Sequence, residues 1–177
     1  LTWPLADGSP VFPGDPPVRL ADAGVPGCRV TRLSLGSHAG THIDAPAHVF
    51  PGGRTLEQYP PARFAGTAAV LASPGDLDRA AGADFLLVRT GWDRRWGAPD
   101  YFTAYPPLDP GLAAAIAAGG FRGVGLDTPG PDRPNALDCH RLLLGADGLI
   151  LENRRRLDRL PPGRFQLWAL PLAVAGA

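Results

Sequence analysis

Apolar positions along this chain fall into short runs, most of them the length of a β-strand. Residues 28–35 alternate apolar and polar side chains, which is the pattern of a half-buried strand. The other runs are more continuously apolar but equally short. We expect strands at 66–72, 84–90, 122–128 and 148–153, and strand-like structure again over 165–174.

Two segments have the features of helices. Asp109 and Pro110 open an alanine-rich stretch that stops near Gly119, with the proline in the first turn, where a helix tolerates it. A second helix is expected from near Asn135 to Gly145. Twenty-one prolines and 23 glycines are spread along the chain and mark no linker or repeat. We predict an α/β fold in which residues 1–177 form a single domain.

Composition narrows the possible functions. Seventeen basic and 17 acidic residues cancel, and every basic residue is arginine. The only basic cluster is Arg154 to Arg156, which we interpret as a solvated face, so nucleic-acid binding is not expected. No apolar run is long enough to span a membrane, and no signal peptide is recognisable. Two cysteines, Cys28 and Cys139, favour reduced thiols and a cytoplasmic location. The absence of methionine, even at position 1, indicates a chain trimmed at its start.

The segment SHAGTHIDAPAH, residues 37–48, concentrates three of the four histidines with one aspartate. His42, Asp44 and His48 follow His38 at even offsets, so an extended strand would place all four side chains on one face. Fully extended, the segment would span about 33 Å, too far for one metal to bridge, so it must curl. We expect His38, His42 and Asp44 to be ligands and His48 to stand off. The alternative is a surface loop with incidental histidines.

Two further residues can complete a metal site. His140 lies on the second expected helix, and Glu152 lies twelve residues later, at the end of a strand. If they converge on the histidine segment, five nitrogen and oxygen ligands meet, including two carboxylates that can bridge. That inventory fits a two-metal centre with open positions for water. Spacing alone also allows a core or helix-surface histidine and a solvated strand-end carboxylate.

Several segments together resemble a known family. HAGTHIDAPAH fits the pattern His-x-Gly-Thr-His-x-Asp-x-Pro-x-His of the cyclase-like metal-dependent hydrolases, which include bacterial kynurenine formamidases and isatin hydrolases. Further similarities run over nearly the whole chain: SPVFPGDPP near the start, LLVRTGW around Arg89, GLDTPGPD around Asp127, and CHRLLLGADGLILEN from Cys139.

The resemblance implies a β-barrel-like mixed sheet flanked by helices, in a homo-oligomer, either a dimer or a tetramer. It implies that one metal is bound at positions matching His38, His42 and Asp44. The second metal would be held by the positions matching Asp44, His140 and Glu152. His48 matches the family's proton shuttle. Phe12 matches a substrate-pocket residue that is usually tryptophan in the formamidases, and Gly130 stands where serine is common.

The implied activity is hydrolysis of N-formyl-L-kynurenine to L-kynurenine and formate by metal-activated water, with one or two divalent ions. We expect zinc first and manganese next, since imidazole and carboxylate suit both. Thr41 and Asp127 are expected to orient ligands or turns. Two alternatives stay open. One is hydrolysis of another cyclic amide or lactone, such as isatin, and the other is a metal-binding module without catalysis.

Overall fold

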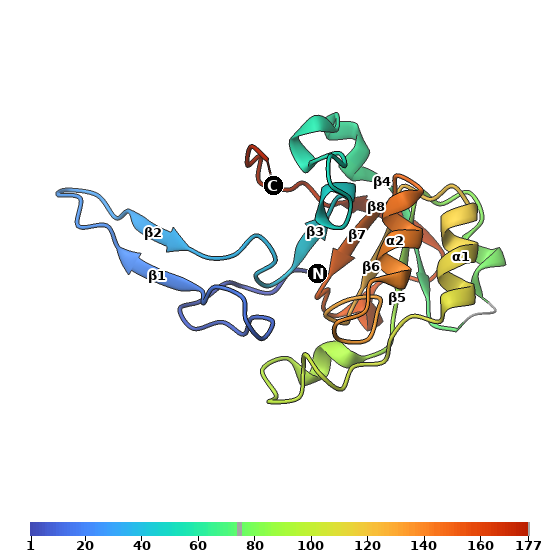
Figure 1. Cartoon of the computed structure of the whole chain (residues 1–177), viewed down its shortest axis with the longest axis horizontal. Helices are drawn as coiled ribbons and strands as arrows, with labels where there is room; N and C mark the ends of the chain where they lie inside the picture. Colours follow the sequence, from blue (N-terminus) through green and yellow to red (C-terminus); the bar gives the residue numbers. More distant parts are fainter. Residues whose placement is uncertain (74–75, 177) are drawn as a thin grey trace.

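The computed structural model describes residues 1–73 and 76–176, and a six-stranded mixed sheet forms its centre (Figure 1). The strand order is β3-β7-β6-β5-β4-β8. The four inner strands are mutually parallel: β4 (Ala65–Leu71), β5 (Phe85–Val88), β6 (Gly123–Leu126) and β7 (Leu149–Glu152). The edge strands β3 (His42–Asp44) and β8 (Arg164–Trp168) run antiparallel to their neighbours.

Alternating residues of these strands build two apolar cores, one on each face of the sheet. Leu86, Val124 and Ile150 point to the first core, which also takes Ile116 of α1 (Pro110–Ala118) and Leu143 of α2 (Asp138–Gly145). The second core holds the intervening strand residues, among them Phe85, Leu87, Leu149 and Leu151. Both faces are buried, which explains why the inner strands read as continuous apolar runs. The predicted α/β class, a mixed sheet flanked by helices, is confirmed; the sheet is open, with β3 and β8 at its edges.

The two helices begin where side chains satisfy their free backbone N–H groups. Asp109 accepts a hydrogen bond from the Leu112 N–H at 2.9 Å and caps α1, as its position before Pro110 predicts. The second helix begins at Asp138, three residues after the predicted start. Asn135 has a left-handed backbone with φ of 67°, which no helical residue adopts.

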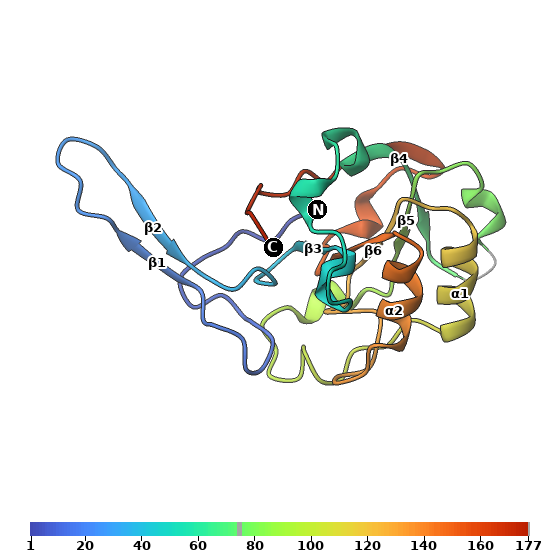
Figure 2. The same cartoon turned by 45° about the horizontal axis from the view of Figure 1, so that its top comes forward.

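A two-stranded arm projects from this body in both views (Figures 1 and 2). It consists of β1 (Arg19–Asp22) and β2 (Thr31–Ser34), which pair antiparallel with each other. The strand predicted over 28–35 is present at Thr31–Ser34, but its predicted half-burial was wrong, because all four residues of β2 are exposed. The alternating pattern is real, but the apolar face has no core beneath it in the described residues: Leu33 is 60% exposed.

The remaining strand predictions are confirmed at 66–72, 84–90, 122–128 and 148–153, each within two residues. Strand structure near the end stops at Trp168, so the predicted continuation to 174 is wrong. The arginine cluster also differs from its interpretation, because Arg154 is only 5% exposed and burial lowers its pKa to about 10. Its aliphatic stem packs close to Gly125. Within the described ranges, no helix has the length and hydropathy of a membrane span.

Candidate metal centre

The histidine segment enters the sheet through its edge strand. In the β3–β7 pair, His42 lies directly opposite Glu152, and Asp44 lies opposite Ile150. A turn precedes β3, and Gly40 in that turn has φ of 66°. The position favours glycine because of this left-handed backbone, whereas an added Cβ atom would meet only the movable end of the exposed Leu5 side chain. The curl predicted for this segment is therefore made before β3 and again in the one-turn 3-10 helix Pro46–His48.

The five predicted metal ligands form one cluster around the buried carboxylate of one of them, Asp44. Asp44 Oδ1 lies 3.0 Å from His38 Nδ1 and 3.4 Å from His42 Nε2. Glu152 bridges the two halves of the site, with Oε2 at 3.3 Å from His42 Nε2 and Oε1 at 3.3 Å from His140 Nε2. His140 Nε2 is 3.9 Å from Asp44 Oδ2. Residues more than 100 positions apart thus form one cluster.

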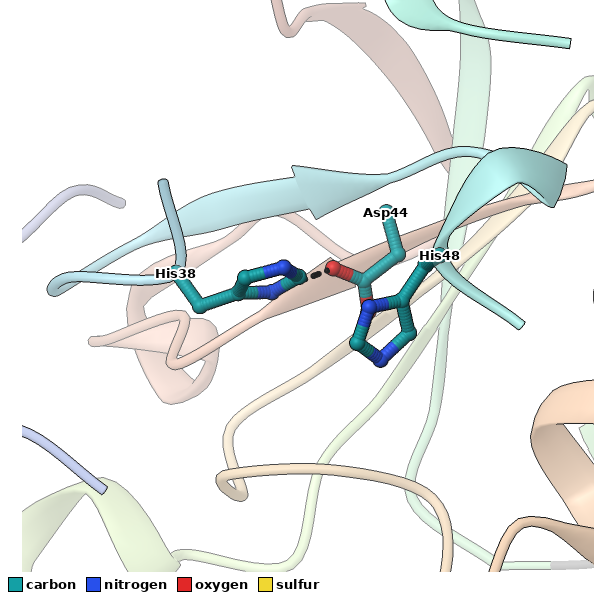
Figure 3. A group of neighbouring side chains, drawn as sticks. All are labelled: His38, Asp44 and His48. Atoms are coloured by element: carbon teal, nitrogen blue, oxygen red, sulfur yellow. Dashed lines mark ion pairs between the residues drawn. The ribbon is translucent and has the colours of Figure 1, made fainter. Parts of the chain in front are cut away.

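His48 also lies at this cluster, on the exposed side. Its ring centroid is 4.4 Å from that of His38 and 5.5 Å from that of His140. His38 and His48 both turn their rings toward the Asp44 carboxylate (Figure 3). Donor atoms within 4.8 Å of one another form two groups, His38 with Asp44 and His48, and His42 with Asp44 and Glu152. His48 therefore lies close enough to the other donor atoms to bind a shared ion. We had expected it to lie farther from the metal.

The donor set fits a divalent cation. Four of the buried side-chain atoms that have no hydrogen-bond partner in the described structure belong to this site: both carboxylate oxygens of Asp44, Glu152 Oε1 and His42 Nε2. Asp44 is only 1% exposed, and a buried carboxylate is strongly unfavourable unless it is paired with positive charge or coordinates a metal. Imidazole nitrogens and carboxylate oxygens are ligands that zinc and manganese accept.

The pKa values of the histidines also show that this site favours positive charge. Burial lowers the pKa of His42, but Asp44 and Glu152 outweigh it and hold that pKa well above its usual value. Burial likewise lowers the pKa of His140, while Glu152, Asp44 and Asp132 raise it to about 9. Without a metal, the two carboxylates therefore favour the protonated forms of these histidines.

Hydrogen bonds fix which nitrogen each histidine presents. His42 Nδ1 lies 3.0 Å from the Gly40 carbonyl oxygen, which can only accept, so Nδ1 carries the hydrogen. His140 Nδ1 lies 2.7 Å from Asp132 Oδ2 and donates to it in the same way. In both residues the Nε2 atom then faces the Asp44 and Glu152 carboxylates. Such outer partners commonly orient metal-binding histidines.

Asp132 was missed by the sequence reasoning. Its carboxylate is buried and accepts from the backbone N–H groups of Cys139 and His140 at 2.8 and 3.0 Å, in addition to the His140 ring. One carboxylate therefore caps α2 and orients the His140 ring. The available signal was an acidic residue shortly before a helix start.

Replacing Asp132 by asparagine is expected to weaken zinc affinity about 10- to 100-fold, the usual cost of losing an outer partner of a metal ligand. The variant keeps the shape of the side chain but removes the charge that supports the His140 ring. Chelator competition measures the affinity. Asp109→Asn is the matched control, because Asp109 caps α1 in the described structure without contacting a histidine. Equal zinc affinity in Asp132→Asn and wild-type protein would contradict this role.

Phe12 lies in an aromatic cluster rather than against open solvent. Its ring packs edge-to-face on Phe102, with centroids 5.9 Å apart. Phe102 packs on Tyr101 at 4.9 Å, and Tyr101 on Trp96 at 5.1 Å. Trp96 in turn stacks on Trp3 at 4.9 Å. Phe102 had no distinguishing feature in the sequence, and only the folded loop places it beside Phe12.

Two other expectations concern residues near the site. Asp127 orients a turn, since its carboxylate accepts from the N–H groups of Thr90 and Gly91 and from the Thr90 hydroxyl. Cys139 faces the first apolar core, with Sγ 3.8 Å from the Leu108 carbonyl oxygen. Burial and the nearby Asp132 raise the pKa of its thiol to about 12, so Cys139 remains a thiol.

Comparison with known proteins finds relatives that are similar to this chain over its full length. A family model described as "Putative cyclase" matches residues 1–133. The kynurenine formamidases of Bordetella avium and Maricaulis maris are 34% and 33% identical, each over 100% of this chain and 91% of the relative. Isatin hydrolase A from Labrenzia aggregata, solved bound to benzyl benzoate, superposes with a TM-score of 0.80 and 26% identity over 98% of this chain and 86% of that one.

A second solved structure, a potential metal-dependent hydrolase with cyclase activity, superposes with a TM-score of 0.81 at 27% identity. It covers 99% of this chain and 90% of that one. The family match over residues 1–133, the full-length relatives and the shared fold all agree with the clustered histidines and carboxylates, so this chain belongs to the cyclase family.

Proposed function

We propose that the protein is a metal-dependent amidohydrolase that converts N-formyl-L-kynurenine to L-kynurenine and formate, cleaving a carbon–nitrogen bond that is not a peptide bond. The observation that carries the proposal is the buried Asp44 carboxylate, which lies close to three histidine rings and belongs to the same cluster of donor atoms as Glu152. The name kynurenine formamidase, borne by relatives about one-third identical over this whole chain, supports the choice of substrate.

His38, His42 and Asp44 would hold one divalent ion, and Asp44, His140 and Glu152 would hold a second. Zinc is the proposed metal and manganese the next candidate. A bound ion supplies a Lewis acid for the substrate carbonyl and lowers the pKa of water toward neutrality. The protein itself contributes the orientation of His42 through Gly40 and of His140 through Asp132.

His48 is the proposed proton carrier. Burial lowers its pKa, and the neighbouring His38 and His140 lower it further, against the opposing effects of Asp44 and Glu152. A neutral imidazole at pH 7 can accept a proton and deliver it to the leaving nitrogen. The aniline-type nitrogen of N-formylkynurenine leaves more readily than an alkylamine, which reduces the help that the leaving group needs.

The direct test is release of kynurenine from N-formyl-L-kynurenine by protein purified without chelator and supplied with zinc or manganese. His48→Ala is expected to retain bound metal but to lose about 100-fold or more in kcat, within the usual range for general acid–base catalysis. Metal content by elemental analysis separates the two possible roles of His48, because loss of metal in this variant would make it a ligand. Normal turnover by His48→Ala would remove it from the mechanism.

A second candidate substrate is a cyclic amide or lactone such as isatin. The structural similarity to isatin hydrolase A supports it, and so does Phe12, which keeps an aromatic surface but lacks an indole N–H donor. A panel that compares kcat/KM for N-formylkynurenine, isatin and a simple lactone decides between them. A strong preference for isatin would replace the leading proposal.

A homo-oligomer, dimer or tetramer, is also proposed, with a second copy of the chain covering the arm. Two-stranded hairpins are marginally stable alone in water, and the arm exposes Val25, Val30, Leu33 and Leu35. The end of β8 and the segment that follows it form a second exposed apolar strip, in which Trp168 is 70% and Leu172 83% exposed. In a homo-oligomer, the arm of one copy can pack against the second apolar strip of another copy.

Leu33→Glu is expected to shift the protein toward monomers, because it places a charge on the apolar face of the arm. Ser34→Glu is the matched control, since it adds the same charge to the opposite face of the same strand. Light scattering after size-exclusion chromatography measures the mass of each. A monomeric wild-type protein, or an unchanged mass for Leu33→Glu, would contradict the proposed interface.

Domain organisation and location complete the proposal. We take residues 1–177 as a single domain, supported by the continuous sheet to which segments from β3 to β8 contribute. A cytoplasmic location is supported by Cys28 and Cys139, which are both free, one exposed and the other buried.

A further inference from the structure

Asn153 follows directly after Glu152 and has an unusual backbone. Its φ is 53°, in the left-handed region, and the residue is 97% buried, being 3% exposed. Asparagine tolerates this conformation better than most residues, but a buried non-glycine residue there is held by its surroundings. The backbone N–H of Asn153 donates to the Thr128 carbonyl oxygen at 3.0 Å, which secures the bend at the end of β7.

The bend turns the side-chain amide of Asn153 between two distant segments. Its Nδ2 donates to the Gly40 carbonyl oxygen at 3.0 Å, and its Oδ1 accepts from the Tyr101 hydroxyl at 2.9 Å. The orientation of the amide follows from chemistry, because a carbonyl oxygen can only accept. The Asn153 backbone oxygen also accepts from the Thr41 hydroxyl at 2.7 Å. One residue thus holds both residues of the Gly40–Thr41 turn.

The Gly40 carbonyl is the same acceptor that receives the His42 Nδ1–H. Asn153 and His42 therefore share one oxygen, and the position of that oxygen determines the tautomer and direction of the His42 ring. On its other side, Asn153 meets Tyr101, whose ring packs on Phe102, and Phe102 packs on Phe12. A continuous set of contacts thus runs from the aromatic cluster to a metal-ligating histidine.

We propose that Asn153 is a positioning residue that sets the orientation of His42 through the Gly40 carbonyl and couples it to the aromatic cluster through Tyr101. The proposal rests on metal binding at this site but not on the identity of the amide substrate. Asn153 touches neither the metal-facing nitrogen of His42 nor the carboxylates by any described hydrogen bond, so it acts through Gly40.

Three variants separate the two contacts. Asn153→Gly removes the whole amide while suiting the left-handed backbone. Asn153→Asp keeps an acceptor for Tyr101 but replaces the donor to Gly40 by an oxygen. Tyr101→Phe removes only the hydroxyl and keeps the donor to Gly40. The probes are the visible absorption spectrum of bound Co²⁺, zinc affinity by chelator competition, and the separate values of kcat and KM.

Asn153→Gly and Asn153→Asp are expected to bind zinc about 10- to 100-fold more weakly and to show an altered Co²⁺ spectrum. A weaker affinity in Asn153→Asp is diagnostic, because its added negative charge alone would favour the cation. Tyr101→Phe is expected to keep zinc affinity within threefold and to change mainly KM. If Asn153→Gly fails to fold, Asn153→Asp still decides the question.

Wild-type Co²⁺ spectra and zinc affinities in both Asn153 variants would overturn the proposal, even if their thermal stability fell. Loss of zinc affinity in Tyr101→Phe equal to that in Asn153→Asp would overturn the route through Gly40. The metal measurements need no amide substrate. A wild-type protein that is inactive on N-formylkynurenine would therefore count against the proposed function, while the test of Asn153 would still be valid.

Discussion

Replacing Asp44 by alanine is expected to remove bound metal and to lower kcat/KM for N-formyl-L-kynurenine at least about a thousandfold, or about 4 kcal/mol in transition-state stabilisation. Asp44 belongs to both groups of donor atoms, and neither of its oxygens has another hydrogen-bond partner in the described structure. Removing it deprives both halves of the centre of their shared negative charge. Elemental analysis and steady-state kinetics measure the two effects.

The control is Asp158→Ala, which removes an exposed carboxylate paired with Arg94 at 3.5 Å. Exposed pairs of this kind contribute about 0–1 kcal/mol to stability, so metal content and turnover should stay at wild-type levels. Circular dichroism establishes that Asp44→Ala is folded. A folded Asp44→Ala protein that keeps one metal per chain, or a tenth of the activity, would contradict the central role of this carboxylate.

Metal affinity is expected to rise steeply between pH 6 and 9. The pKa of His140 is raised to about 9, and that of His42 well above its usual value, in the metal-free protein. Each histidine must lose its proton to bind a cation, and each proton released changes the affinity about tenfold per pH unit. While both are protonated, the change approaches about 100-fold per unit. Asp44 adds no proton, since burial raises its pKa but His42 and His38 hold it well below normal.

The stability of the metal-free fold should also depend on pH, and it should fall as pH rises. A histidine pKa that is raised on folding stabilises the metal-free fold fully below the unfolded value of about 6.5, and this contribution is lost as pH rises through about 9. The gap in Tm between zinc-loaded and chelator-treated protein should therefore widen from pH 6.5 to 8.5. Calorimetry in buffers of different ionisation enthalpy counts the released protons, and His140→Ala should release one fewer. An affinity that is flat across this range would contradict these protonation states.

The sequence predicted the inner strands well because burial on both faces makes a run continuously apolar whatever its neighbours are. The arm shows the limit of such patterns. The apolar and polar pattern of residues 28–35 predicted a strand that covers a core, yet such a pattern says only where apolar side chains lie and not what covers them. The start of α2 was placed too early because its cap is Asp132, six residues before Asp138, and comes from a turn rather than from the adjacent position.

The residues of the candidate site also include some that the sequence predicted and others that it did not. Even spacing and ligand chemistry indicated the histidine segment. Position along the chain suggested His140 and Glu152, and the family resemblance supported them; the fold brings all of these residues together. Asp132, Asn153 and Phe102 were not found, because their importance depends on which loop meets which. An asparagine that joins Gly40 to Tyr101 has no local pattern; its partners are 113 and 52 residues away.

The pairing of His42 with Glu152 across β3 and β7 has a mechanical consequence. β3 is only three residues long and lies at the edge of the sheet, yet it is the strand through which the arm joins the body. A cation held by side chains of both strands would act as a staple across that short ladder. Loading the centre would therefore stiffen the root of the arm, and amide hydrogen exchange at residues 42–44 should slow when zinc is added.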